Sequence, residues 1–147
     1  MCMRGRILGH NERNAQAVVE FALVLPLFVL LVFGAVEFGR AYLRQHLLTN
    51  AAREGARVGS LPDSDEQAVV DAVEGFLTDV GLNTGDFSVT VDVVNPDGND
   101  PDSLSGAEQG HRVHVTVAND FEVLSGSIIP GFQGTVGLDA TCVFRHE

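Results

Sequence analysis

The chain contains no lysine and no tryptophan, and it has only two cysteines among its 147 residues. Small secreted domains that depend on disulfides normally carry more cysteines, so this sequence does not predict a disulfide framework. A long apolar run separates Cys2 from Cys142, and a membrane between them would prevent pairing within one molecule. Cys142 is then a free thiol or an intermolecular partner. Burial in a strand is the simpler interpretation, because cysteine packs as a small apolar residue.

Positive charge is scarce after residue 60. Residues 1–60 carry seven arginines and four glutamates, whereas residues 61–147 carry two arginines and sixteen acidic residues. The whole chain has a formal net charge of −11. An acidic second half disfavours nucleic acid and anionic membrane surfaces as partners of that half, because both would repel it.

Charge is absent from Phe21–Val36, a run of sixteen residues directly after Glu20. As a helix this run measures about 24 Å, and with residues 15–20 it reaches about 33 Å, against about 30 Å of hydrocarbon. The sequence therefore predicts one membrane-spanning helix with Glu20 inside or close to one face. Pro26 should loosen or kink this helix locally. A carboxylate in hydrocarbon is costly, so Glu20 is expected to have a function.

Three interpretations of this segment remain open. A cleaved signal peptide would use the early arginines as its basic region, with Gly39 and Ala41 near the cut, but Glu37 and Arg40 crowd that site and the apolar run is long. A plain anchor would leave Glu20 as a charge that reaches water at the interface. A processed anchor would be cut before Glu20 and keep the carboxylate for assembly. The arginines near the helix ends do not decide the orientation, and the acidic bulk after residue 60 favours its translocation.

Three segments in this region resemble a known family. They read AVVEFALVLP at 17–26, FGAVEFGR at 33–40 and TNAAREGAR at 49–57. In wording and order they resemble TadE-like proteins, the minor pilins or pseudopilins of the tight-adherence (Tad, Flp-type) pilus. The resemblance covers about residues 15–60, and the remainder agrees only in layout. It implies a single-pass inner-membrane subunit with a cytoplasmic amino terminus, which initiates or supports the pilus and does not form its bulk.

The same resemblance implies cleavage by a prepilin peptidase, a membrane aspartic protease. The family's motif has a small residue, usually Gly, before the cut, then four residues, then Glu-Phe or Glu-Tyr. On this chain Glu20 and Phe21 place the cut between Ala15 and Gln16, with Ala15 where the family usually has Gly. Cleavage would leave an ammonium group on Gln16. A buried carboxylate is tolerated when it is paired, so Glu20 is expected to accept this group from a neighbouring subunit.

The helix is expected to continue past the membrane to about residue 60, where Gly59 and Pro62 end it. Glu37–Arg40 and Glu54–Arg57 are spaced to pair across one turn. A stripe of apolar and small residues faces either the protein's own core or another pilin or the assembly platform, and small residues would permit close helix approach. Its members are Phe38, Ala41, Tyr42, Leu48, Ala51, Ala52, Gly55, Ala56 and Gly59.

Residues 61–147 predict an acidic α+β head. Ser64 and Gln67 form a capping box before an amphipathic helix that ends near Val80, with Gly81 as its terminator. Alternating segments at 87–94, 113–118 and 136–144 predict three strands of an antiparallel meander with that helix laid across it. The fold class is therefore α+β, with a cytoplasmic leader at 1–15, a transmembrane and assembly helix at 16–60, and an extracytoplasmic head at 61–147.

Catalytic and metal-binding motifs are weak or missing. Asp97, Asn99 and Glu108 imitate a calcium loop, but Pro101 and Asp102 occupy positions that need a ligand and a glycine. His111 and His114 are three apart on a strand and point to opposite faces, which suits a metal poorly. No nucleophile elbow and no phosphate-binding loop is present in the sequence. Neither an enzyme nor a cofactor is predicted.

The sequence thus predicts a non-enzymatic minor pilin whose partners are other pilins or pseudopilins, a prepilin peptidase, the assembly platform and membrane lipid. The first alternative is a membrane-anchored extracytoplasmic binding domain that is neither processed nor assembled. A secreted soluble domain that begins near Tyr42 is the second alternative.

Overall fold

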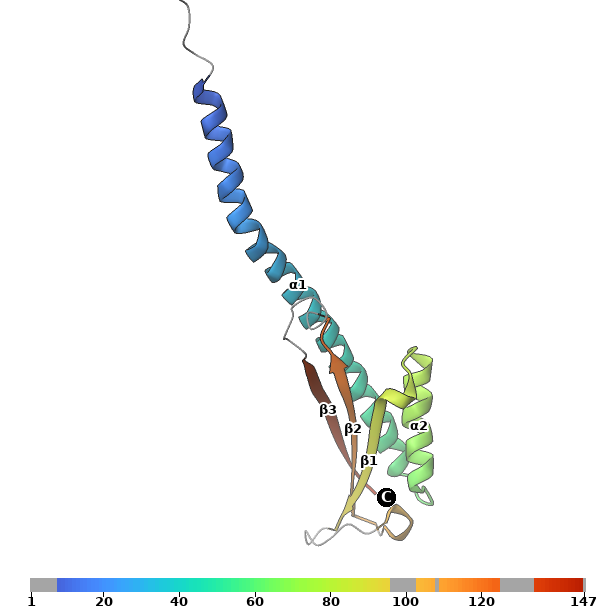
Figure 1. Ribbon diagram of the computed structural model, residues 1–147. Coiled ribbons are helices and arrows are strands. Elements are labelled where there is room, and N and C mark those ends of the chain that lie inside the picture. Colours follow the sequence, from blue (N-terminus) through green and yellow to red (C-terminus); the bar gives the residue numbers. More distant parts are fainter. Residues whose placement is uncertain (1–7, 96–102, 108, 125–133, 147) are drawn as a thin grey trace, which may run out of the picture. The chain divides into compact units, whose positions relative to one another are not determined.

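The computed structural model describes residues 8–95, 103–107, 109–124 and 134–146 (Figure 1). The chain divides into two compact units, residues 1–39 and 40–147. One helix, α1 (Leu8–Gly59), supplies the described part of the first unit and continues into the second. It ends at Gly59, as the sequence predicts.

In the first unit α1 is apolar and exposed. All described side chains from 14 to 36 are solvent-exposed within the structure, so none of this apolar surface is covered by the protein itself. Pro26 lies inside the helix, which continues through it. Among the described residues, one helix is long and apolar enough to cross a membrane, with its candidate span beginning at Asn14. An uncovered apolar helix of this length is stable only in lipid or against other apolar helices.

Helix α2 (Glu66–Asp79) begins one residue later than the predicted capping box. Asp65, not Ser64, is the N-cap: its carboxylate accepts a hydrogen bond of 2.7 Å from the backbone N–H of Ala68. Ser64 instead donates its hydroxyl to the Leu61 carbonyl. A carboxylate caps and also complements the positive end of the helix dipole, which explains why Asp65 takes the position.

The end of α2 confirms Gly81 as the terminator. Gly81 has a φ of +77°, a left-handed conformation that glycine adopts without strain. The Gly81 N–H bonds the Thr78 carbonyl and the Leu82 N–H bonds the Leu77 carbonyl. This pair of bonds is a Schellman motif, which satisfies carbonyls that the helix end leaves open.

Three strands form the predicted antiparallel meander: β1 (Phe87–Val94), β2 (Arg112–Glu122) and β3 (Thr135–Arg145), in the order β1-β2-β3. The register pairs Phe87 with Asn119 in the first ladder and Glu122 with Thr135 in the second. The single-turn 3₁₀ helices η1 (Thr84–Asp86) and η2 (Leu104–Gly106) precede β1 and β2. β2 extends four residues past its predicted end because Asn119 and Phe121 continue the inward alternation.

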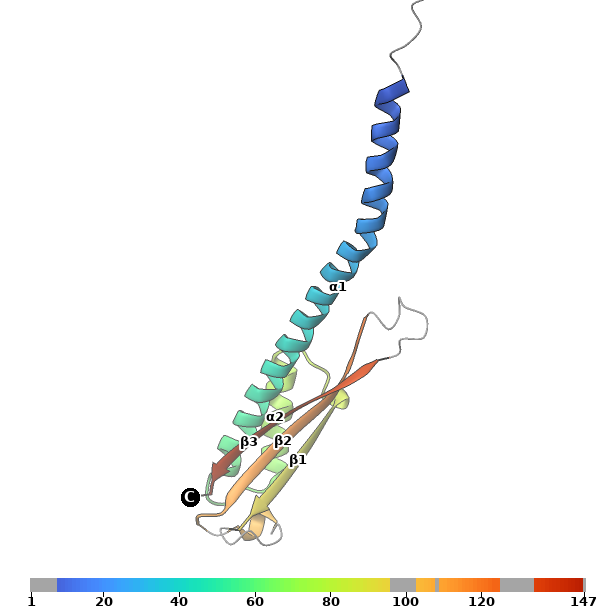
Figure 2. The ribbon, with the colours of Figure 1, turned by 90° about the vertical axis from the view of Figure 1, so that its left-hand side faces the viewer.

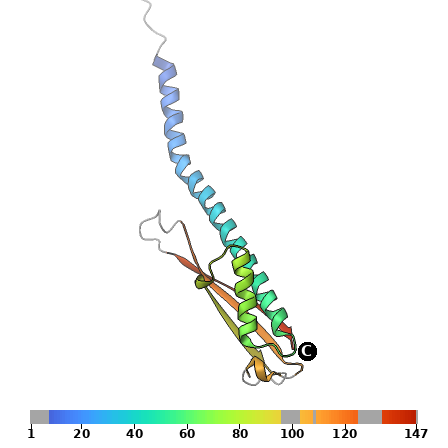
Figure 3. The same ribbon diagram turned by 90° about the vertical axis from the view of Figure 1, so that its right-hand side faces the viewer.

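Both helices of the second unit cover one face of the sheet. Figure 2 shows the other face of the sheet, and Figure 3, from the opposite side, shows α2 and the last turns of α1 in front of the strands. The core is fully or almost fully buried; it comprises Leu48, Ala51, Ala52, Ala56, Val69, Val73, Leu77, Val93, Leu104, Val113, Val115, Val117 and Ala140. The predicted helix on the sheet is therefore confirmed, and the last turns of α1 join it there.

The stripe on α1 divides between the two interpretations. Its distal part, from Leu48 to Gly59, is buried in the protein's own head, so the small residues there serve the core and not a neighbouring pilin. At Gly55 an added Cβ would lie 2.6 Å from the Val73 Cγ2 atom. Glycine therefore permits the close approach of α1 and α2. Phe38 and Tyr42, at the proximal end, remain exposed.

Candidate functional site

The predicted processing and assembly residues all lie on α1 in the first unit. Ala15, Gln16, Glu20 and Phe21 are exposed, and the Phe21 side chain is 63% accessible. Gln16 and Glu20 are four residues apart, so their side chains share one face of the helix. The Gln16 amide Nε2 donates a hydrogen bond of 3.1 Å to Glu20 Oε1. The structure thus brings together the residue after the predicted cut and the carboxylate that the motif requires.

The Glu20 carboxylate is surrounded on its helix by apolar side chains. Val18, Val19 and Phe21 are each at least 60% exposed, so they would present hydrocarbon to lipid or to another helix. A carboxylate in that environment is costly unless hydrogen bonds or an opposite charge satisfy it. The Gln16 amide satisfies one oxygen, and an ionised carboxylate has about four acceptor sites. Acceptor capacity for a partner's cation therefore remains.

The distal part of α1 carries a surface ion pair. Arg57 Nε and Nη2 contact the two carboxylate oxygens of Glu54 at 3.1 and 2.5 Å, which confirms the predicted pairing. The hydrogen bond from Arg57 holds the pKa of Glu54 below its ordinary value, although desolvation opposes the shift slightly. The same bond raises the pKa of Arg57. Both groups are solvent-exposed, so this pair is a local helix contact of small energetic effect.

The remaining predicted candidates do not converge on a site. The calcium-like loop, with Asp97, Asn99 and Glu108, lies outside the described residues. His111 is buried and His114 is half-buried. Within the described ranges no group of three His, Cys, Asp or Glu side chains is arranged to hold a metal ion. Cys142 lies in β3, is partly buried and is a free thiol.

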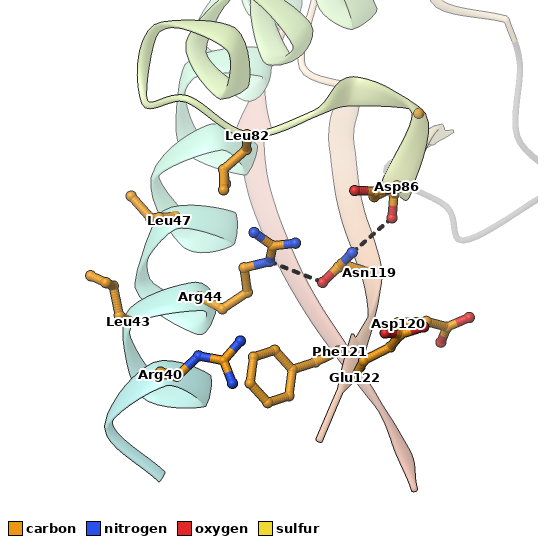
Figure 4. A pocket seen from close by; sticks show the side chains of 11 residues that line it. Arg40, Leu43, Arg44, Leu47, Leu82, Asp86, Asn119, Asp120, Phe121 and Glu122 are labelled. Carbon is orange, nitrogen blue, oxygen red and sulfur yellow. Dashed lines mark hydrogen bonds between the residues drawn. The ribbon is translucent and has the colours of Figure 1, made fainter. Parts of the chain in front are cut away.

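One arrangement in the second unit is absent from the sequence prediction. A pocket of about 690 Å³ opens between α1 and the end of β2 (Figure 4). Arg40 stacks on the Phe121 ring at 5.2 Å, and Arg44 stacks on the Phe87 ring at 4.9 Å. The four-residue spacing of the arginines predicts that they share a helix face. Their aromatic partners lie far away in the sequence, and no local signal identifies them.

Hydrogen bonds fix Arg44 within this pocket. Its Nε donates a bond of 3.1 Å to Asn119 Oδ1, and Asn119 Nδ2 donates one of 2.7 Å to the Asp86 carbonyl. Asn119 is only 4% exposed, so the chain of bonds is held rigidly between α1, β2 and η1. The other lining residues are Leu43, Leu47, Leu82, Gly85, Asp120 and Glu122.

Comparison with known proteins decides the family of the first part of the chain. Residues 15–57 match the family described as TadE-like protein. The predicted resemblance to TadE-like proteins is thereby confirmed over this segment, which starts at Ala15 and includes Gln16, Glu20 and Phe21. No curated protein and no solved structure matches the chain.

The matched segment coincides with the apolar, exposed part of α1 and its first turns in the head. A TadE-like segment on a helix that can cross a membrane supports a pilus-associated protein with one membrane-spanning helix. The segment includes Arg40 and Arg44 but not their partners on β1 and β2.

Proposed function

We propose that this chain is a minor pilin, or pseudopilin, that supports initiation or assembly of a Tad-type pilus. The match of residues 15–57 to TadE-like proteins carries this proposal. The chain has a structural role in it and catalyses no reaction. α1 anchors the protein in the inner membrane, with its amino terminus in the cytoplasm and the α+β head outside.

In this proposal a prepilin peptidase cuts between Ala15 and Gln16. The cut removes the leader and leaves an ammonium group on Gln16, one helical turn before Glu20. The ammonium group of one subunit pairs with the Glu20 carboxylate of its neighbour, which sets the axial register between their helices. In an apolar environment each charge is stabilised only by the other, so the pair selects one register strongly.

The intramolecular bond from Gln16 supports this role for Glu20. It orients one carboxylate oxygen along the helix at 3.1 Å and leaves the second oxygen as an acceptor. Phe21 and the exposed valines on either side of Glu20 supply the apolar contact between helices, where van der Waals packing drives association in lipid.

Substitution of Glu20 tests the proposal. Glu20→Ala and the isosteric Glu20→Gln should insert into the membrane as well as the unaltered protein does. Both should lose co-purification with the other pilins, by about tenfold or more, because a buried charge pair is broken. Glu74→Gln, an exposed residue on α2, is the matched control and should co-purify normally. Normal assembly of both Glu20 variants would contradict the proposed pairing.

The alternative is an anchored binding domain that is neither processed nor assembled. Such a protein would retain residues 1–15 and would be indifferent to both Glu20 substitutions. The two functions therefore differ in the mass of the mature chain and in the effect of one carboxylate.

A further inference from the structure

The pocket between α1 and β2 combines two guanidinium groups with apolar walls. Leu43, Leu47 and Leu82 line it beside Arg40 and Arg44. A site of this composition suits a ligand with a negative group and an attached hydrocarbon part. All its residues belong to the second unit.

Arg44 is oriented before any ligand binds. Asn119 holds its Nε at 3.1 Å, and the Phe87 ring lies against its guanidinium plane. Among the described residues no acceptor contacts the terminal Nη groups of Arg44. These donors form a fixed planar fork, the geometry that recognises phosphate oxygens in pairs.

The acidic residues near the pocket do not face the arginines. Asp120 and Glu122 flank Phe121 on β2, and successive strand residues point to opposite faces. Figure 4 shows the Phe121 ring beside Arg40, with the side chains of Asp120 and Glu122 directed away from it. Asp86 is exposed at the rim, where its main-chain carbonyl accepts the bond from Asn119. The charge presented to a ligand between the helix and the strand is therefore mainly positive.

The arginines follow the apolar run closely along the same helix. Arg40 and Arg44 are four and eight residues after Val36, which is about 6 and 12 Å along an α-helix. Side chains of a helix lean toward its N-terminus, so both guanidinium groups reach back toward the membrane. The headgroup layer extends about 5–7 Å beyond the hydrocarbon on each side, which places lipid phosphate within their reach.

We propose that this pocket binds the phosphodiester group of an anionic phospholipid. Arg40 and Arg44 contact the phosphate oxygens, and the leucines contact the glycerol and the first methylenes of the acyl chains. The acidic surface of the head repels anionic membranes in general, so this pocket fixes the one point at which the head accepts an anionic lipid. The inference uses the membrane-spanning helix and is independent of cleavage and of pilus assembly.

Native mass spectrometry of the full chain, purified in a neutral detergent, tests this proposal. Dioleoylphosphatidylglycerol is the probe, dioleoylglycerol is the same lipid without phosphate, and inorganic phosphate tests the anion alone. We expect one phosphatidylglycerol per chain, bound at least about tenfold more tightly than either comparison ligand. Equal retention of dioleoylglycerol, or equal affinity for inorganic phosphate, would overturn the proposal.

Four variants separate a built site from general attraction by charge. Arg40→Gln and Arg44→Gln should each weaken phosphatidylglycerol binding about tenfold, whereas Arg53→Gln, an exposed arginine of α1 outside the pocket, should change it less than about twofold. Arg44→Lys keeps the charge and loses the planar fork, so it should weaken binding nearly as much as Arg44→Gln. Circular dichroism establishes that each variant is folded. Unchanged binding by folded Arg44→Lys, or an equal loss in Arg53→Gln, would disprove the pocket.

Discussion

The His146 ring nitrogen Nδ1 lies 3.1 Å from the carbonyl oxygen of Gly59, the last residue of α1. His146 is 7% exposed, and its main chain bonds His111 and Gly110. The end of β3 thereby satisfies a carbonyl at the end of α1, which the helix itself leaves open. This contact ties the end of the anchoring helix to the far end of the sheet.

His146→Ala should destabilise the head by about 1–2 kcal/mol, because the Gly59 carbonyl loses its partner in a buried location. Thermal unfolding of the full chain in detergent, followed by circular dichroism, measures the effect. His114→Ala is the control, since His114 is only half-buried, and it should cost less. Equal midpoints for the two variants would show that the contact with Gly59 does not stabilise the head.

Two glycines predict opposite effects of the same substitution. A Cβ at Gly55 would lie 2.6 Å from Val73 Cγ2 and 3.2 Å from Val115 Cγ1, so Gly55→Ala should overpack the core and cost about 1–3 kcal/mol. A Cβ at Gly75 meets nothing within 4 Å, so Gly75→Ala should stabilise α2 by about 0.5–1 kcal/mol. Denaturant unfolding of both variants provides the comparison. Stabilisation by Gly55→Ala would contradict the close packing of α1 on α2.

The two candidate caps of α2 differ in their expected energies. Asp65→Ala removes the acceptor of the Ala68 N–H and should cost about 1 kcal/mol. Ser64→Ala removes only the bond to the Leu61 carbonyl, and its effect should stay within about 0.5 kcal/mol. Unfolding free energies from denaturant titrations decide between them. A larger loss for Ser64→Ala would restore the capping box that the sequence favours.

The ion pair on α1 predicts a small acid sensitivity. Because the Arg57 bond lowers the pKa of Glu54 in the folded state, its stabilisation is present above the unfolded pKa of Glu54 and disappears as the pH falls through the folded value. NMR titration of the Glu54 carboxyl should give a pKa below that of an unpaired glutamate. In Arg57→Gln the pKa should return toward the ordinary value. A Glu54 pKa that is equal in the two proteins would remove the proposed cause.

Most of the fold follows from local patterns. The spacing of Val69, Val73 and Leu77 predicts α2, and the alternation of Val113 and Val115 predicts β2, because each pattern reflects one buried face. The TadE-like segment is likewise recognisable from its residues alone. Each of these features depends on neighbours within a few positions of the chain.

The pocket on α1 could not be predicted in the same way. Arg44 and Asn119 are 75 positions apart, and only the register of β2 against β1 brings the amide opposite the helix. Asn119 also interrupts the apolar alternation of β2, so the sequence places the end of the strand too early. The N-cap was misplaced by one residue because Ser64 and Asp65 are both good caps, and local preference does not separate them.

The mass of the mature protein, isolated from the membranes of cells that carry the complete pilus machinery, tests the account most directly. Cleavage after Ala15 predicts a chain that begins at Gln16, and Ala15→Gly should give the same terminus with at least equal yield. An intact chain that retains its initiating methionine region in both proteins would contradict processing as a pilin. It would favour an anchored domain that remains as it was inserted.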